Sequence, residues 1–176
     1  MEANFLNIEY LKNGSTTQKK VYKIITKFNI IEQLKQFSPI LVGTFPLGIN
    51  IETSDIDIIG ATNDFSGAFD YLVKNFSEFH DFKIQLNDQD QIKYILCSFW
   101  IKRFRIEIFL ENKNPKEQIA YKHMLIEENI LNQKDENFKQ KIIDLKNKGL
   151  KTEEAFGLLL GLDGDPFQKL LDYQMD

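Results

Sequence analysis

The chain has 176 residues, of which 43% are hydrophobic and 27% charged, and its formal net charge is -4. This length suits one globular domain, and no apolar run reaches the roughly 20 residues that a membrane-spanning helix needs. The single cysteine excludes an internal disulfide and a cysteine-rich zinc site. The acidic balance disfavours a protein whose affinity depends on neutralising many nucleic-acid phosphates.

The first part of the chain predicts a helix and then a strand. No basic stretch is followed by an apolar one at the N-terminus, so a secretory signal is not expected and we predict a cytoplasmic protein. The run Ser15-Thr16-Thr17-Gln18 resembles a capping box, and apolar residues at helical spacing predict a helix over 17–36. Ser38-Pro39 ends this helix, and a strand is expected from Ile40.

The remaining elements indicate an α+β fold rather than alternating βαβ units, because the strands cluster early and the helices late. We predict one domain over 1–176, with the sheet and its helices in 1–112 and a C-terminal helical part in 113–176. After a loop over 43–55, strands are expected at 55–60, 82–86, 92–102 and 104–111 and a helix at 66–78. Further helices are expected at 115–133, before Gly149, at 153–160 with Thr152 as N-cap, and from Asp165-Pro166 to 173.

Two aspartates lie on one face of the strand predicted at 55–60. Because strand side chains alternate, Asp55 and Asp57 share one face while Ile56 and Ile58 share the other. Aspartate is disfavoured in strands, so this pair calls for an explanation. Carboxylate oxygens are the ligands that Mg²⁺ prefers, and the pattern therefore predicts a metal site, with a solvated strand surface as the alternative.

The glycines before this strand complete a recognisable pattern. Gly43-Thr44, Gly48 and the run Ser54-Asp55-Ile56-Asp57-Ile58 together resemble the signature of the nucleotidyltransferase superfamily that includes DNA polymerase beta. In that superfamily a glycine pair precedes an Asp-x-Asp strand and a later strand supplies a third carboxylate, a position that Glu107 matches. More narrowly, nearly the whole chain resembles a family of uncharacterised bacterial single-domain nucleotidyltransferase-like proteins, known only as a domain of unknown function.

This resemblance implies a nucleotidyltransferase fold, with a small mixed β-sheet, flanking helices and a C-terminal helical part that forms one wall of the cleft. It implies two Mg²⁺ ions, with Mn²⁺ as an alternative, and a nucleoside triphosphate as co-substrate. The implied reaction moves a nucleoside monophosphate to a hydroxyl or phosphate on a small molecule, a protein or, less favoured, a nucleic acid. A non-catalytic nucleotide-sensing or partner-binding module is the alternative. The implied catalytic and metal-binding residues are Asp55, Asp57 and Glu107, and the nucleotide-binding residues are Gly43, Thr44, Ser54, Arg103 and Arg105.

Several of these roles have rival interpretations. Glu107 would complete the metal site or take the proton of the acceptor, or would only balance the two arginines. Arg103 and Arg105, which share the face of Glu107 by alternation, would grip the triphosphate or neutralise the acidic site. Leu47 stands where many relatives have a basic residue, which leaves phosphate neutralisation to the arginines or to a late lysine such as Lys151.

Three further features are expected to be structural. Ser54 is expected to orient the entry to the strand rather than to touch substrate. His123 is predicted to be a hydrogen-bonded structural histidine, with substrate contact as the alternative. The mixed charges of residues 134–148 predict a solvated helix face.

Overall fold

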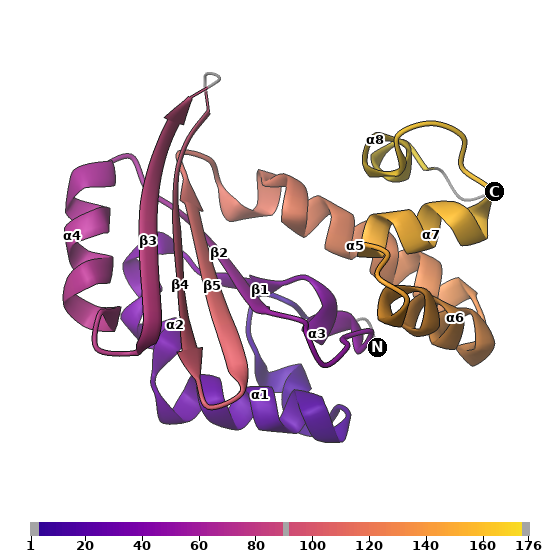
Figure 1. The fold of residues 1–176 in the computed structure, drawn as a ribbon, viewed down its shortest axis with the longest axis horizontal. Coiled ribbons are helices and arrows are strands. Elements are labelled where there is room, and N and C mark those ends of the chain that lie inside the picture. Colours follow the sequence, from indigo (N-terminus) through magenta and orange to yellow (C-terminus); the bar gives the residue numbers. More distant parts are fainter. Residues whose placement is uncertain (1–3, 90–91, 174–176) are drawn as a thin grey trace.

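The computed structural model describes residues 4–89 and 92–173, so the ends of the predicted domain, 1–3 and 174–176, lie outside it (Figure 1). The five strands are β1 (Ile40–Val42), β2 (Ile56–Ala61), β3 (His80–Gln89), β4 (Ile92–Ile101) and β5 (Phe104–Glu111). The helices are α1 (Thr16–Lys27), α2 (Ile30–Gln33), α3 (Thr44–Leu47), α4 (Phe65–Phe76), α5 (Ile119–Gln133), α6 (Glu136–Asn147), α7 (Thr152–Leu160) and α8 (Pro166–Leu171). Short 3-10 turns lie at Glu9–Asn13, Lys35–Phe37 and Pro115–Glu117.

The strands form one mixed sheet in the order β1-β2-β5-β4-β3. β2 and β5 are parallel, whereas the other neighbouring pairs are antiparallel. The α+β fold with a small mixed sheet is therefore confirmed. The pairing of β2 with β5 matters most for the site, because it sets two segments far apart in the sequence side by side.

Helices cover the two faces of the sheet in two groups (Figure 1). On one face, alternate strand residues such as Ile58 and Ile108 join α1 and α4 in a buried core that includes Val21 and Leu72. The other core joins β1 and the end of β2 to α3 and to the helices α5 to α8, with Phe156 of α7 fully buried in it. The C-terminal helices thus lie against only part of the second face.

The predicted helix over 17–36 is divided in the structure. Its start is confirmed, since the Ser15 hydroxyl accepts from the Gln18 backbone N–H at 3.2 Å and the Gln18 side chain accepts from the Ser15 N–H at 2.8 Å. α1 ends at Lys27 because Asn29 adopts a left-handed conformation with φ 55°. Asparagine tolerates this conformation better than most residues, and the chain resumes as the short α2.

Other element boundaries also differ from prediction; the strand predicted at 82–86, for example, is the longer β3. The predicted helix over 115–133 begins as a 3-10 turn, and α5 starts only at Ile119, because Gln118 is extended with ψ 148°. The predicted loop over 43–55 contains the short helix α3, which ends at Gly48 in the left-handed conformation, with φ 65°. Leu47 at the end of α3 is 7% exposed and packs in the core shared with the C-terminal helices. Its apolar character therefore has a packing role.

Candidate active site

Asp57 and Glu107 lie side by side on neighbouring parallel strands. Asp57 of β2 is the register partner of Glu107 of β5, so their side chains share one face of the sheet. Asp55 directly precedes β2 instead of lying within it, and its side chain is 28% exposed. All three carboxylates that the sequence pattern selects therefore line one cleft, although no choice of one oxygen from each places all three within 4.8 Å of one another.

Gly43 places the turn after β1 directly against Asp57. Its backbone has φ 76° and ψ -146°, a conformation that essentially only glycine adopts. A Cβ atom added here would lie 2.5 Å from Oδ2 of Asp57. Glycine is thus needed both for the backbone conformation and for the close approach of the carboxylate.

Two hydroxyl groups flank the carboxylates. Oγ1 of Thr44 is buried and has no hydrogen-bond partner among the described residues, which is unusual for a buried polar atom and fits a place where a ligand oxygen would bind. The Ser54 hydroxyl accepts from the Ile51 N–H at 3.0 Å, and the Ser54 N–H donates to the Ile51 carbonyl at 3.1 Å. Ser54 therefore holds the chain that enters β2, as expected.

Arg105 supplies positive charge inside the carboxylate group. Its Nη1 donates to Oδ2 of Asp55 at 3.0 Å, and its Nη2 lies 3.6 Å from Oε2 of Glu107. The Ser98 hydroxyl accepts from Nη2 at 3.2 Å, which fixes the guanidinium plane. Arg105 thus bridges two of the three carboxylates.

The structure does not bring Arg103 to this group. Lys102 has φ 56°, and residues 102–103 form the turn before β5, so the alternation that would have aligned Arg103 with Arg105 does not apply. Arg103 is exposed, and its guanidinium carbon lies 5.1 Å from the centroid of the Phe104 ring.

Burial raises the pKa values of two of the carboxylates, Asp57 and Glu107. Burial, followed by the negative charges of Glu107 and Asp55, raises the pKa of Asp57 to about 8. Burial also raises the pKa of Glu107, against the opposing effect of Arg105. A cluster of oxygen ligands that is short of positive charge fits a hard divalent cation such as Mg²⁺.

These residues lie in an open cleft with a volume of about 570 Å³, called here the carboxylate cleft. Lys146 of α6, which the helical charge pattern had placed on a solvated face, is only 6% exposed and lines it. Its Nζ donates to the Ile49 carbonyl at 2.9 Å, and burial lowers its pKa to about 8, against the opposing effect of nearby carboxylates. The cleft is lined by Thr44, Ile51, Thr53, Ser54, Asp55, Asp57, Glu107, Lys146, Leu150, Lys151, Thr152 and Glu153.

Lys151 lies at the N-terminus of α7, where the helix faces the carboxylate cleft. α7 begins at Thr152 with Lys151 as its N-cap residue, one position earlier than predicted, and the Lys151 N–H donates to Oε2 of Glu154 at 2.7 Å. A helix N-terminus favours negative charge because its first N–H groups point outward. Lys146 and Lys151 therefore supply the positive charge in the cleft that a basic residue at the position of Leu47 would otherwise provide.

A smaller pocket of about 220 Å³ adjoins the cleft, and we call it the histidine chamber. Thr44, Asp57, Thr152 and Glu153 line both spaces, while His123 and Glu127 of α5 line only the chamber. His123 is 3% exposed, and neither ring nitrogen has a hydrogen-bond partner among the described residues, in contrast to the hydrogen-bonded histidine that was predicted. Burial lowers the pKa of His123, which favours the neutral ring.

Comparison with known proteins identifies the family and the fold. Residues 23–173 match the family described as "Domain of unknown function (DUF4269)". No curated protein is similar enough in sequence to count as a match. Among the described residues, none of the helices combines the length and the apolar character that crossing a membrane requires.

Solved structures of Cid1 poly(U) polymerase are similar in fold. A mutant bound to MgATP matches with a TM-score of 0.56 and 15% identity, over 81% of this chain and 48% of that chain. A form described as Mg 3'-dATP bound matches with a TM-score of 0.53 and 12% identity, over 93% of this chain and 52% of that chain. A complex with the UTP analogue UMPNPP matches with a TM-score of 0.52 and 16% identity, over 78% and 43%. This chain spans about half the length of these structures, and identities so low show a shared nucleotidyltransferase fold alone.

Proposed function

The chain belongs to the DUF4269 family, and we propose that it is a nucleotidyltransferase, which moves a nucleoside monophosphate from a nucleoside triphosphate to a hydroxyl or phosphate acceptor. The observation that carries this proposal is the register pair of Asp57 and Glu107, with Asp55 beside it and the Gly43 turn against it. An acceptor oxygen forms a bond to the α-phosphorus, and the bond from that phosphorus to the β-phosphate oxygen breaks. The acceptor loses a proton and pyrophosphate leaves.

Asp55, Asp57 and Glu107 would hold two Mg²⁺ ions, with Mn²⁺ as an alternative. The raised pKa of Asp57 supports this assignment, because it reflects burial of this carboxyl group and the negative charges of Glu107 and Asp55 near it. When bound, the ions would neutralise phosphate charge and make the acceptor hydroxyl more acidic. The bridging position of Arg105 partly neutralises the same carboxylates when no cation is bound.

The remaining groups would bind the triphosphate. The N–H groups around Gly43 and Thr44, together with the Thr44 hydroxyl, would donate to phosphate oxygens, because the glycine turn permits close approach. Lys146 and Lys151, which line the cleft, would balance the phosphate charge. Glu107 would either complete the metal site or accept the proton of the acceptor.

The test is to incubate the purified chain with Mg²⁺ and each labelled nucleoside triphosphate, and to follow pyrophosphate, labelled small molecules and labelled protein. Asp57→Asn and Asp55→Asn are expected to lower turnover by at least about a hundredfold, since each removes a charged ligand. Glu111→Gln is the matched control, because Glu111 lies in β5 on the same face as Glu107 but pairs with Ala61 at the opposite end of β2.

Several outcomes would contradict the proposal. Turnover that does not depend on Mg²⁺, or that survives both aspartate substitutions, would remove the carboxylates from the chemistry. Nucleotide binding without pyrophosphate release under any acceptor condition would instead support the sensing module. The acceptor is unspecified by the geometry, so the assay includes the protein itself, small hydroxyl compounds and RNA.

A further inference from the structure

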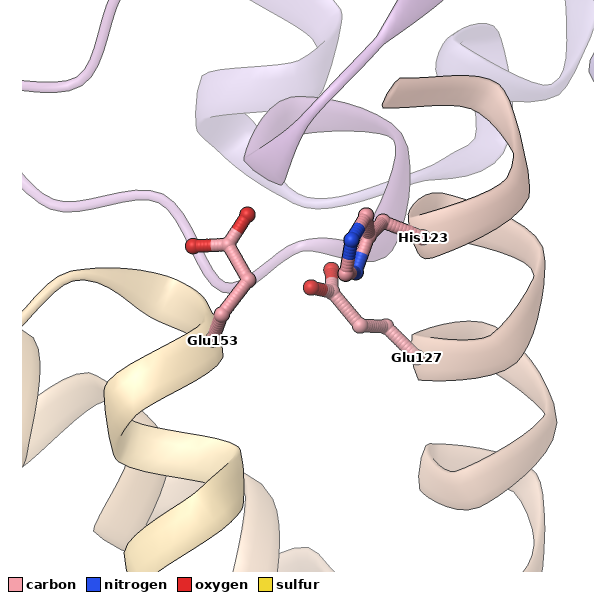
Figure 2. A group of neighbouring side chains, drawn as sticks. All are labelled: His123, Glu127 and Glu153. Carbon is pink, nitrogen blue, oxygen red and sulfur yellow. The ribbon is translucent and has the colours of Figure 1, made fainter. Parts of the chain in front are cut away.

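A second group of potential metal ligands lies in the histidine chamber, on the C-terminal helices. His123 and Glu127 are four residues apart on α5, so they lie on one face of that helix, and Glu153 faces them from the first turn of α7 (Figure 2). One ligand atom from each of these three side chains lies within 4.8 Å of the others. In the described part of the chain this is the one group of three His, Cys, Asp or Glu side chains that is so close.

The burial of His123 and Glu127 is energetically unfavourable unless a ligand or ion binds their polar atoms. His123 and Glu127 are each 3% exposed. Both ring nitrogens of His123 are buried without a hydrogen-bond partner among the described residues, although a neutral imidazole has one donor and one acceptor to satisfy. Leaving such groups unsatisfied in the protein interior is unfavourable, because they lose their hydrogen bonds to water. Figure 2 shows the imidazole beside the Glu127 carboxylate, with the Glu153 carboxylate across the gap from them.

We propose that His123, Glu127 and Glu153 form a binding site for one zinc ion in the histidine chamber, beside the carboxylate cleft. An imidazole with two carboxylates suits zinc better than magnesium, because magnesium prefers oxygen ligands alone while zinc accepts both nitrogen and oxygen. A tetrahedral ion with bonds of about 2.1 Å sets its ligand atoms roughly 3.4 Å apart, so the three side chains need only close by small rotations.

The surroundings of the group fit this assignment. Two carboxylates and a neutral imidazole carry a charge that a divalent ion balances. Lys146 of α6, whose charge interacts with Glu127 and Glu153, donates its hydrogen bond to the Ile49 carbonyl instead. Phe167 of α8 packs on the imidazole, with ring centroids 4.3 Å apart, which would hold the ring in place. Three protein ligands leave a fourth position for water or a ligand, and Asp57 lines the same chamber.

The proposal is tested without nucleotide, so its failure is distinct from failure of the proposed reaction. The full chain, treated with chelator and then dialysed, is titrated with zinc by calorimetry in excess Mg²⁺, which occupies the carboxylate cleft, and one zinc ion per chain is expected. Glu127→Gln and Glu153→Gln keep the side-chain shape but remove a charged ligand, and each is expected to weaken zinc binding by tenfold or more. Glu128→Gln, on the same helix beside Glu127, and Asp55→Asn, in the cleft, are expected to leave it unchanged.

A second measurement keeps the test independent of whether the variants fold. The chain has two histidines, and His80 is exposed at the start of β3. In protein with nitrogen-labelled histidine, the two ring nitrogens of His80 therefore serve as an internal control. On addition of one equivalent of zinc, a ring nitrogen of His123 is expected to shift while both signals of His80 stay in place. An unshifted His123 ring, or zinc affinity that falls with Asp55→Asn but not with Glu127→Gln, would overturn the proposal.

Discussion

Replacing Gly43 by alanine tests how closely the turn after β1 is fitted to the carboxylates. Gly43 has φ 76° and ψ -146°, and its added Cβ would lie 2.5 Å from Oδ2 of Asp57. Atoms at this separation clash, so either the turn or the Asp57 side chain must move. Because Asp57 is held by its strand, we expect the variant to lose both stability and the geometry of the carboxylate group.

The size of the effect follows from two contributions. A non-glycine residue in this backbone conformation costs about 1 to 3 kcal/mol. Displacing the Asp57 carboxylate adds about another 1 kcal/mol, giving roughly 3 kcal/mol in all. For a chain of this size, that loss corresponds to a fall in melting temperature of about 6 to 12 °C.

Gly161→Ala is the matched control. Gly161 ends α7 with φ 67° and ψ 36°, and a Cβ there would meet nothing within 4 Å. This substitution therefore isolates the cost of a left-handed residue, about 1 to 2 kcal/mol. Urea unfolding gives the stability of both variants, and calorimetry gives their Mg²⁺-dependent nucleotide affinity. If Gly43→Ala lowers the free energy of unfolding no more than Gly161→Ala and keeps full nucleotide affinity, the close fit against Asp57 has no role in function.

Three other perturbations address the charges of the cleft. Arg105→Met removes the 3.0 Å ion pair with Asp55, and it is expected to lower the melting temperature more without Mg²⁺ than with it. Lys146→Met removes the hydrogen bond to the Ile49 carbonyl, and it is expected to cost about 1 to 3 kcal/mol in urea unfolding and to weaken nucleotide binding about tenfold. Since the pKa of Asp57 is raised from 3.8 to about 8, the folded chain holds a proton that the unfolded chain releases. Stability in EDTA is therefore expected to fall as pH rises from about 4 to 8, and thermal unfolding of Asp57→Asn should show a flatter slope.

Each of these has its own contrary result. An Arg105→Met variant that is destabilised equally with and without Mg²⁺ would mean that the guanidinium does not stand in for a cation. Unchanged nucleotide affinity in Lys146→Met would assign that lysine to the fold alone. A metal-free chain whose stability rises between pH 5 and 8 would show that Asp57 ionises as an ordinary aspartate.

Local patterns predicted most of the secondary structure because they depend on neighbouring residues. The capping box at Ser15, the alternation in β5 and the proline that begins α8 are all satisfied within a few residues of the chain. Predictions failed where a single backbone conformation divided a regular pattern, as at Asn29 between α1 and α2. Apolar periodicity continues through such a break and does not reveal it.

The candidate site shows the same division between local and distant information. Alternation predicts the strand face on which Asp57 and Glu107 each lie. It does not predict that their two strands are neighbours in the sheet. The helical charge pattern around Lys146 predicted a solvated face, and only the packing of α6 buries that lysine beside the cleft. The spacing of His123 and Glu127 predicts that they share one helix face. The third residue of this group, Glu153, comes from another helix, so the spacing does not reveal it.

The sequence by itself determined the residue types for the carboxylate site, the glycine turn before it and the order of strands and helices, since these follow from side-chain chemistry and local backbone preference. Only the tertiary structure decided which groups meet. The parallel pairing of β2 and β5 joins the carboxylates, and the turn before β5 sends Arg103 to the surface. The placement of α5 and α7 on the walls of one pocket assembles His123, Glu127 and Glu153. These depend on contacts between distant segments, which one strand or helix does not specify.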